Sequence, residues 1–161
     1  MARALIVGCG CRGRELGREL TARSWAVRGT SRDESGLAEI EAAGIEPALA
    51  DPERLGTILD RVDDVAVVLW LMGSARGTEE SLREIHGARL EHLLERLVDT
   101  PVRGFVYEGA GTVPAPLLRA GGEAVAAAAR TWRIPVAVFE QAPDDHRAWL
   151  KAALGATLGL L

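Results

Sequence analysis

Three glycines, Gly8, Gly10 and Gly13, have the spacing Gly-x-Gly-x-x-Gly, which predicts a binding site for a phosphorylated ligand. They follow the apolar run 4–7 and precede a stretch of helix-forming residues. In such a strand-turn-helix unit, the first glycine makes the tight turn and the second lets the backbone approach a pyrophosphate. The third lets the helix pack closely on the strand. The turn therefore predicts a dinucleotide site at the amino-terminal end of the helix.

The residues between these glycines would line the mouth of the site; they are Cys9, Cys11 and Arg12. A cysteine pair beside a helix N-terminus could also serve redox or metal chemistry, because such a position lowers a thiol pKa. A zinc site needs four ligands, however, and no second pair of Cys or His accompanies these two. We therefore expect the cysteines to fill a tight turn, and we expect no metal.

The end of the second predicted strand should select the cofactor. NAD requires a carboxylate there for its ribose hydroxyl, whereas NADP requires cations for its 2'-phosphate. The residues at this point are Thr30, Ser31 and Arg32, so a guanidinium and a hydroxyl are available to a phosphate. NADP is therefore favoured over NAD. A shifted strand end would instead place Asp33 at the ribose, and Ser31 with Glu34 also has the form of a helix capping box.

Three further residues complete the predicted cofactor site. Asp51 follows the third predicted strand and could accept a hydrogen bond from the adenine amino group, although Asp51-Pro52 also has the form of a helix start. Trp70 and Leu71 end the fourth predicted strand and should lie near the ribose and nicotinamide.

The elements that position these residues alternate regularly between strand and helix. Short apolar runs predict strands near 4–7, 25–30, 45–50, 65–71, 104–107 and 135–139. Segments with helical periodicity separate them, including one long helix over 78–99 and an alanine-rich helix over 114–132. This alternation predicts an α/β fold, a doubly wound parallel sheet of about six strands of the Rossmann type, within a single domain over 1–161.

Composition limits the partners and the compartment. A formal net charge of -4 argues against a nucleic-acid or anionic membrane surface, because both require clustered positive charge. No apolar run approaches the roughly 20 residues of a membrane-spanning helix, so we expect a cytoplasmic protein. The leucine stripe of 78–99 and the leucine-rich tail 154–161 make a homodimer plausible, although such a stripe is more often core.

Over about residues 2–140 the chain resembles the atypical short-chain dehydrogenase/reductase superfamily, including its extended epimerase-like and nitrogen-metabolite-repressor-like members. The glycine turn, Gly-Thr-Ser-Arg at 29–32, Ala50-Asp51, the apolar run 65–71 and Phe-Val-Tyr at 105–107 carry the resemblance. It implies a Rossmann fold, an NAD(P) cofactor and a homodimer. It also implies a catalytic Ser or Thr after the fifth strand and a Tyr-x-x-x-Lys on the next helix.

The sequence departs from the family at this catalytic pair. Tyr107 and Lys151 are its single tyrosine and lysine, so no Tyr-x-x-x-Lys exists. Without the pair, the family's proton relay is lost. A noncatalytic or redox-sensing NADP-binding protein is the first expectation. An atypical NADP-dependent reductase or epimerase is the second, using Glu108, Thr112 or His86 as acid or base, and a ligand-free scaffold for a protein partner is the third. We expect the three histidines, His86 among them, to lie at the surface.

Overall fold

All six strands of the protein join one parallel sheet. The computed structural model describes residues 1–161. The strand order is β3-β2-β1-β4-β5-β6, and every neighbouring pair is parallel. The strands are β1 (Arg3–Val7), β2 (Ala26–Ser31), β3 (Glu46–Leu49), β4 (Val67–Trp70), β5 (Gly104–Glu108) and β6 (Val136–Phe139). The predicted doubly wound α/β fold is confirmed, and its strand order reverses between β1 and β4, where such folds bind ligands.

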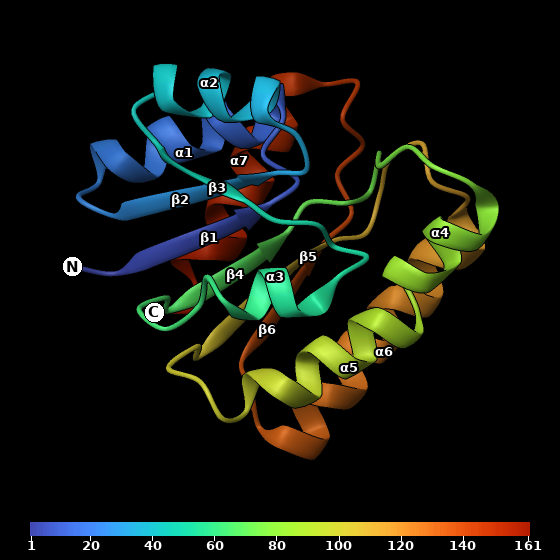
Figure 1. Cartoon of the computed structure of the whole chain (residues 1–161). Helices are drawn as coiled ribbons and strands as arrows, with labels where there is room; N and C mark the ends of the chain where they lie inside the picture. Colours follow the sequence, from blue (N-terminus) through green and yellow to red (C-terminus); the bar gives the residue numbers. More distant parts are fainter.

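Seven helices cover the two faces of this sheet. They are α1 (Cys11–Ala22), α2 (Glu34–Ala42), α3 (Leu55–Leu59), α4 (Glu79–Ile85), α5 (Ala88–Leu97), α6 (Ala115–Trp132) and α7 (His146–Leu158). One face carries α1, α2 and α7, and the other carries α3 to α6 (Figure 1). The central strands β1, β4 and β5 are almost completely buried because helices cover both of their faces, as in other parallel sheets. None of the helices is both long and apolar enough to cross a lipid bilayer.

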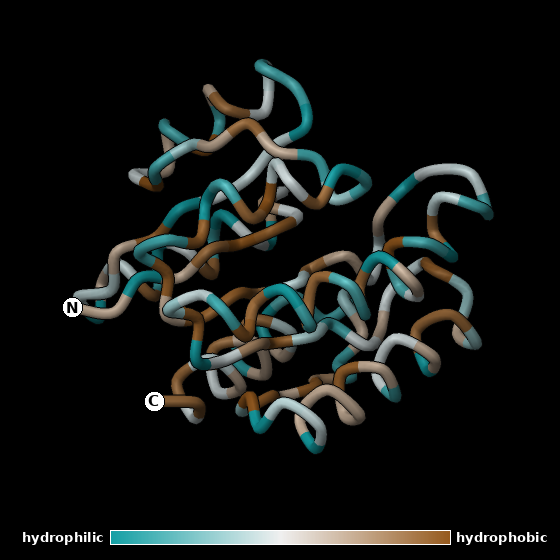
Figure 2. The backbone as a smooth tube through the Cα atoms, turned by 60° about the horizontal axis from the view of Figure 1, so that its bottom comes forward, coloured by the Kyte–Doolittle hydropathy of each residue, from teal (hydrophilic) through white to brown (hydrophobic).

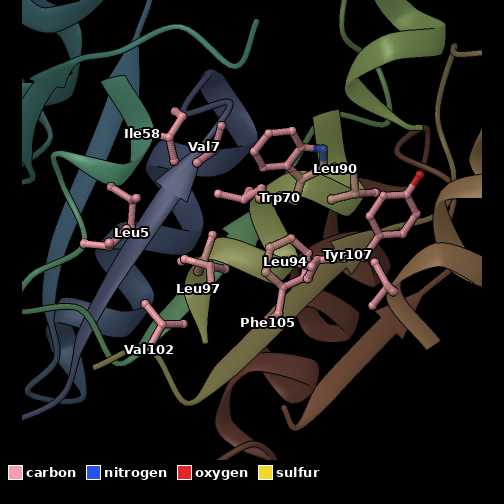
Figure 3. Close-up of a cluster of buried hydrophobic side chains, with 14 of the residues drawn as sticks. Leu5, Val7, Ile58, Trp70, Leu90, Leu94, Leu97, Val102, Phe105 and Tyr107 are labelled. Carbon is pink, nitrogen blue, oxygen red and sulfur yellow. The ribbon is translucent and has the colours of Figure 1, made fainter. Parts of the chain in front are cut away.

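Each face of the sheet has its own hydrophobic core. The larger cluster has 18 buried residues and includes Trp70, Phe105 and Tyr107, packed under the leucines of α5 (Figure 3). The second cluster has 15 buried residues and joins Leu16 of α1 to Trp149 of α7. Along the backbone, hydrophobic segments follow the strands, and hydrophilic segments lie toward the outside of the molecule (Figure 2). Successive strand residues point to opposite faces, so one apolar strand supplies both cores.

The prediction of one long helix over 78–99 is wrong, because this segment forms two helices, α4 and α5. Gly87 lies between the two helices at φ -127° and ψ -112°, outside the helical region. A Cβ on Gly87 would lie 2.6 Å from the carbonyl oxygen of Arg83, which explains why glycine occupies this kink. The leucines of α5 (Leu90, Leu93, Leu94 and Leu97) are completely buried within the protein. The leucine stripe is therefore core, and the homodimer stays a prediction.

Two predicted helix starts also differ from the structure. Asp33, rather than Ser31, caps α2, because its carboxylate accepts a hydrogen bond from the Gly36 amide at 3.2 Å. Asp51 does not start α3, which begins only at Leu55. Its carboxylate instead accepts a hydrogen bond from the Glu53 amide at 2.9 Å, which makes a local turn. In both cases the sequence predicted the correct loop, but the helix begins at a later residue than predicted.

Candidate functional site

A cleft of about 410 Å³ lies at the carboxyl ends of β1, β2, β3 and β4. The turns that follow these strands meet at this edge of the sheet (Figure 1). We call it the large cleft. Nine of the predicted cofactor residues line it: Gly8, Cys9, Gly10, Arg12, Thr30, Ser31, Arg32, Asp51 and Leu71. Its volume falls within the roughly 300–1,000 Å³ of small-molecule sites.

The three glycines of the turn have three different environments. Gly8 has φ +87°, and a Cβ on it would collide with the carbonyl oxygen of Leu71. A Cβ on Gly13 would lie 3.2 Å from the carbonyl oxygen of Gly8, which is the close helix-strand contact expected there. A Cβ on Gly10 would meet nothing within 4 Å. The middle glycine therefore borders open space, and a ligand can approach its backbone.

The amino-terminal end of α1 is free to bind an anion. Gly10 caps the helix without any side-chain hydrogen bond, and the first turn holds no acidic residue. The first intrahelical bond at this end runs from the Arg14 amide to the Gly10 carbonyl at 2.8 Å, so the amides of residues 11–13 have no partner in the protein. Free amides and the positive end of the helix dipole both favour a phosphate. This end of α1 fits the pyrophosphate of a dinucleotide.

At the end of β2, Arg32 lines the large cleft, whereas the carboxylate of Asp33 does not. Arg32 is exposed and lies 3.7 Å from Glu53 in an ion pair at the cleft edge. Thr30 is buried, and Ser31 donates its hydroxyl to the carbonyl of Asp33 at 2.9 Å. Hydrogen bonds from Ser35 and the Gly36 amide lower the pKa of Asp33. Asp33 thus acts as a helix cap and does not line the cleft.

Two arginines that were not among the predicted cofactor residues also line the large cleft. Arg14, on the first turn of α1, makes an ion pair with Glu39 at 3.4 Å, and Arg76 comes from the loop after β4. Arg14 could have been found, since it directly follows the last glycine of the turn. Arg76 carried no such signal, because its place depends on how the loop 71–78 folds. With them, the cleft holds four arginines against three acidic residues.

Trp70 does not reach the site predicted for it. Its side chain is completely buried in the larger core, and its indole donates a hydrogen bond to the Ile85 carbonyl at 3.2 Å. The alternation of β4 turns Trp70 toward α5, away from the large cleft. Leu71, the next residue, lines the cleft.

The cysteines of the turn have separate environments. Cys9 is buried beneath the turn, where a Cβ on Gly29 of β2 would overlap its sulfur. Burial raises the pKa of the Cys9 thiol to about 12, partly offset by the charge of Arg14. Cys11 is exposed, and no three His, Cys, Asp or Glu side chains gather where they could hold a metal.

A second space of about 110 Å³ lies on the other side of the glycine turn, and we call it the small hollow. Cys11 and Gly13, the remaining predicted cofactor residues, line it together with Glu108 and Trp149. The Glu108 carboxylate is buried, and both of its oxygens are engaged. Oε1 accepts from the Gly73 amide at 2.8 Å, and Oε2 accepts from the Trp149 indole at 2.7 Å. Burial raises the pKa of Glu108, and these two bonds partly offset the shift.

The other candidate acid/base groups are held elsewhere. His86 is buried, contrary to the surface position expected for it, because it bridges β5 and the loop after β4. Its Nδ1 lies 2.7 Å from the Tyr107 hydroxyl, and its Nε2 lies 2.9 Å from the Met72 carbonyl. Since a carbonyl only accepts, Nε2 carries the proton and the tyrosine hydroxyl donates to Nδ1. Thr112 is exposed and lines neither space.

Comparison with known sequences finds few relatives of this chain. No protein-family model matches the chain. Protein YeeZ of Escherichia coli K12 is 28% identical over 124 residues, which cover 70% of this chain and 45% of YeeZ. The chain thus spans less than half the length of that relative.

Solved structures with this fold include a Bacillus halodurans protein named as an NAD-dependent epimerase/dehydratase. It has a TM-score of 0.69 and 14% identity, and the match covers 89% of this chain and 71% of that one. A short-chain dehydrogenase/reductase superfamily protein from Agrobacterium tumefaciens with bound NAD has a TM-score of 0.66 and 20% identity, with coverages of 84% and 48%. Triphenylmethane reductase of Citrobacter sp., complexed with NADP(H), has a TM-score of 0.65 and 19% identity, with coverages of 86% and 48%. The predicted resemblance to the short-chain dehydrogenase/reductase superfamily is confirmed for the fold.

Proposed function

We propose that this chain is a noncatalytic NADP-binding protein. The observation that carries the proposal is the large cleft, which is lined by Gly10 and Arg12, at the open amino-terminal end of α1, and by the guanidinium-bearing Arg32. The amides of residues 11–13 would hold the pyrophosphate, and Arg32 with Ser31 would hold the 2'-phosphate. Asp51 lies on the same cleft, where it could accept from the adenine amino group.

The charge pattern at the end of β2 supports NADP over NAD. An NAD site needs a carboxylate beside the ribose hydroxyls, and Asp33 does not line the large cleft; its Oδ1 accepts from the Gly36 amide and the Ser35 hydroxyl at the start of α2. Arg32 has only a long, exposed ion pair with Glu53. Such surface pairs contribute about 0–1 kcal/mol, so a phosphate can replace Glu53 at little cost.

The hydrogen bonds of the candidate acid/base groups support a noncatalytic role. NADPH supplies a hydride when bound to a reductase, and reduction of a carbonyl also needs a proton donor beside it. Tyr107 is completely buried, and burial raises the pKa of its hydroxyl. Glu108 and His86 are each held by two internal hydrogen bonds. An atypical reductase using Glu108 would first have to break these contacts.

Titration calorimetry of the full chain with NADP+ and NAD+ tests the proposal. We expect NADP+ to bind more tightly than NAD+. Replacing Arg32→Ala should weaken NADP+ about tenfold and NAD+ by less than about twofold, because only NADP+ loses a charged hydrogen bond. Arg96→Ala is the matched control, since Arg96 is an exposed arginine on α5, outside the cleft.

Three results would contradict the proposal. If Arg32→Ala lowers the affinity for NADP+ and NAD+ equally, Arg32 does not bind the 2'-phosphate. Steady oxidation of NADPH across a panel of aldehydes and ketones would favour the atypical reductase. If neither dinucleotide binds, the remaining hypothesis is a scaffold for a protein partner.

A further inference from the structure

The glycine turn divides the crevice into two unequal spaces. The large cleft has about 410 Å³, and the small hollow has about 110 Å³. Both are lined by Gly8, Gly10, Arg12 and Leu71, so they meet where a pyrophosphate would lie. A doubly wound sheet binds one nucleotide on each side of this point, and the residues after β2 contact the adenosine side. The large cleft is therefore the adenosine half, and the small hollow is the half that would take the nicotinamide.

Side chains from two distant segments close the nicotinamide half. Trp149 of α7 is 1% exposed, and its indole nitrogen lies 2.7 Å from Glu108 at the end of β5. Its ring packs edge-on against Phe139 of β6 with centroids 5.7 Å apart. On the side of the glycine turn, the guanidinium of Arg12 lies 5.7 Å from the centroid of the Trp149 ring, within the range of a cation-π contact.

Opening this half would cost buried hydrogen bonds. Glu108 is 2% exposed, and its two oxygens are already used by the Gly73 amide and the Trp149 indole. Displacing the indole would leave one carboxylate oxygen without a donor in a dry environment, which is unfavourable. The space left beside it is well below the roughly 300 Å³ of the smaller ligand sites. The residues present therefore fit the adenosine half of a dinucleotide and do not fit the nicotinamide half.

We infer that the ligand recognised by this chain is a 2'-phosphorylated adenosine diphosphate group, and that the nicotinamide of NADP stays outside the protein. This inference rests on the proposed function and narrows it. Since the redox-active ring makes no contact, NADP+, NADPH and 2'-phospho-ADP-ribose should bind with similar affinity. Occupancy of the chain would then depend on the concentration of the phosphorylated nucleotide. The redox state of the nucleotide would have no effect on binding.

Calorimetry with four nucleotides on the full chain tests the inference. We expect NADP+, NADPH and 2'-phospho-ADP-ribose to have dissociation constants within about threefold of one another. Nicotinamide mononucleotide should give no binding heat. A preference of more than about tenfold for NADP+ or NADPH over 2'-phospho-ADP-ribose, or binding of nicotinamide mononucleotide alone, would overturn it.

The variant Trp149→Ala tests whether the indole closes the hollow. It should strengthen NADP+ binding relative to 2'-phospho-ADP-ribose by about fivefold, because the vacated space can accept the nicotinamide. Binding of 2'-phospho-ADP-ribose in the same variant shows that the fold is intact. The matched control is Trp132→Ala, which removes an exposed tryptophan from the carboxyl end of α6 and should leave the ratio unchanged. An unchanged ratio in Trp149→Ala would overturn the role of the indole, and if this variant does not fold, the wild-type series decides alone.

The outcomes separate this inference from the proposed function. Binding of the nucleotides with a clear contribution from the nicotinamide would overturn the inference and leave an NADP-binding protein. Absence of binding by all four nucleotides would overturn both.

Discussion

The two halves of the crevice are built from the same repeated strand-helix unit, yet they use their polar groups differently. Where the two halves meet, the amides at the start of α1 have no partner, and in the adenosine half Arg14 and Arg32 hold only long ion pairs of 3.4 and 3.7 Å. In the nicotinamide half, both oxygens of Glu108 are saturated by buried donors. Groups with spare hydrogen-bonding capacity can bind a ligand, whereas saturated buried groups stabilise the fold.

The loop 71–78 lines the large cleft and contacts Glu108 of the small hollow. Its Gly73 amide donates to Glu108, and its Gly73 carbonyl accepts from the Val113 amide at 3.0 Å. Tyr107, one residue earlier on β5, is joined through His86 to the carbonyl of Met72 in the same loop. The loop is thus anchored to β5 and to the segment after it at several points, so the closed half is part of the protein core.

The largest expected effect comes from the turn that the two halves share. Gly8→Ala should destabilise the protein by about 3 kcal/mol, because it combines a positive φ with a collision at the Leu71 carbonyl. Gly10→Ala should cost under about 1 kcal/mol, since its Cβ enters open space, yet it should abolish nucleotide binding. Urea unfolding and calorimetry on both variants check this contrast. Full nucleotide affinity in Gly10→Ala would contradict the placement of the pyrophosphate.

Replacing His86→Leu should have the next largest effect, a loss of about 2 kcal/mol at pH 8, because two buried hydrogen bonds disappear. Burial lowers the pKa of His86 below its usual 6.5. On acidification below this value the unfolded chain takes up the proton first, so wild-type stability falls and the difference from the variant narrows. Unfolding curves from pH 8 to pH 5 measure the effect. His92→Leu, at an exposed position, is the control, and a gap that stays constant with pH would argue against a neutral buried His86.

Glu108→Gln should have the smallest effect, a loss of about 1 kcal/mol of stability at pH 4, because glutamine retains one of the two acceptors. Its value lies in the pH dependence. The pKa of Glu108 is raised above its usual 4.5, so as the pH rises from there the unfolded chain ionises first and wild-type stability decreases. The decrease relative to Glu108→Gln should reach about 1.4 kcal/mol per pH unit within that window. Denaturation at pH 4 to 7, with Glu91→Gln as the exposed control, tests it; parallel curves for the wild type and Glu108→Gln would refute the raised pKa.

The sequence predicted the open half of the crevice better than the closed half. The glycine turn and the end of β2 are local patterns, so the placement of Gly8, Gly10 and Arg32 could be predicted from spacing alone. The contact between Glu108 and Trp149 joins residues 41 positions apart and carries no local signal. The break at Gly87 was missed because the leucine periodicity continues on both sides of it. The position predicted for Trp70 was wrong because a residue at the carboxyl end of a strand can still point into a core, and Trp70 points into the larger one.

The single lysine of the chain offers a direct view of α7. Lys151 lies on the exposed side of this helix, two residues beyond Trp149. Apart from the amino terminus, it is the one primary amine that an acylating dye can label, so a fluorophore there would sit on the element that carries the closing indole. A change in its emission on addition of nucleotide would indicate that α7 moves. Unchanged emission would indicate that the nicotinamide half keeps its conformation when the nucleotide binds.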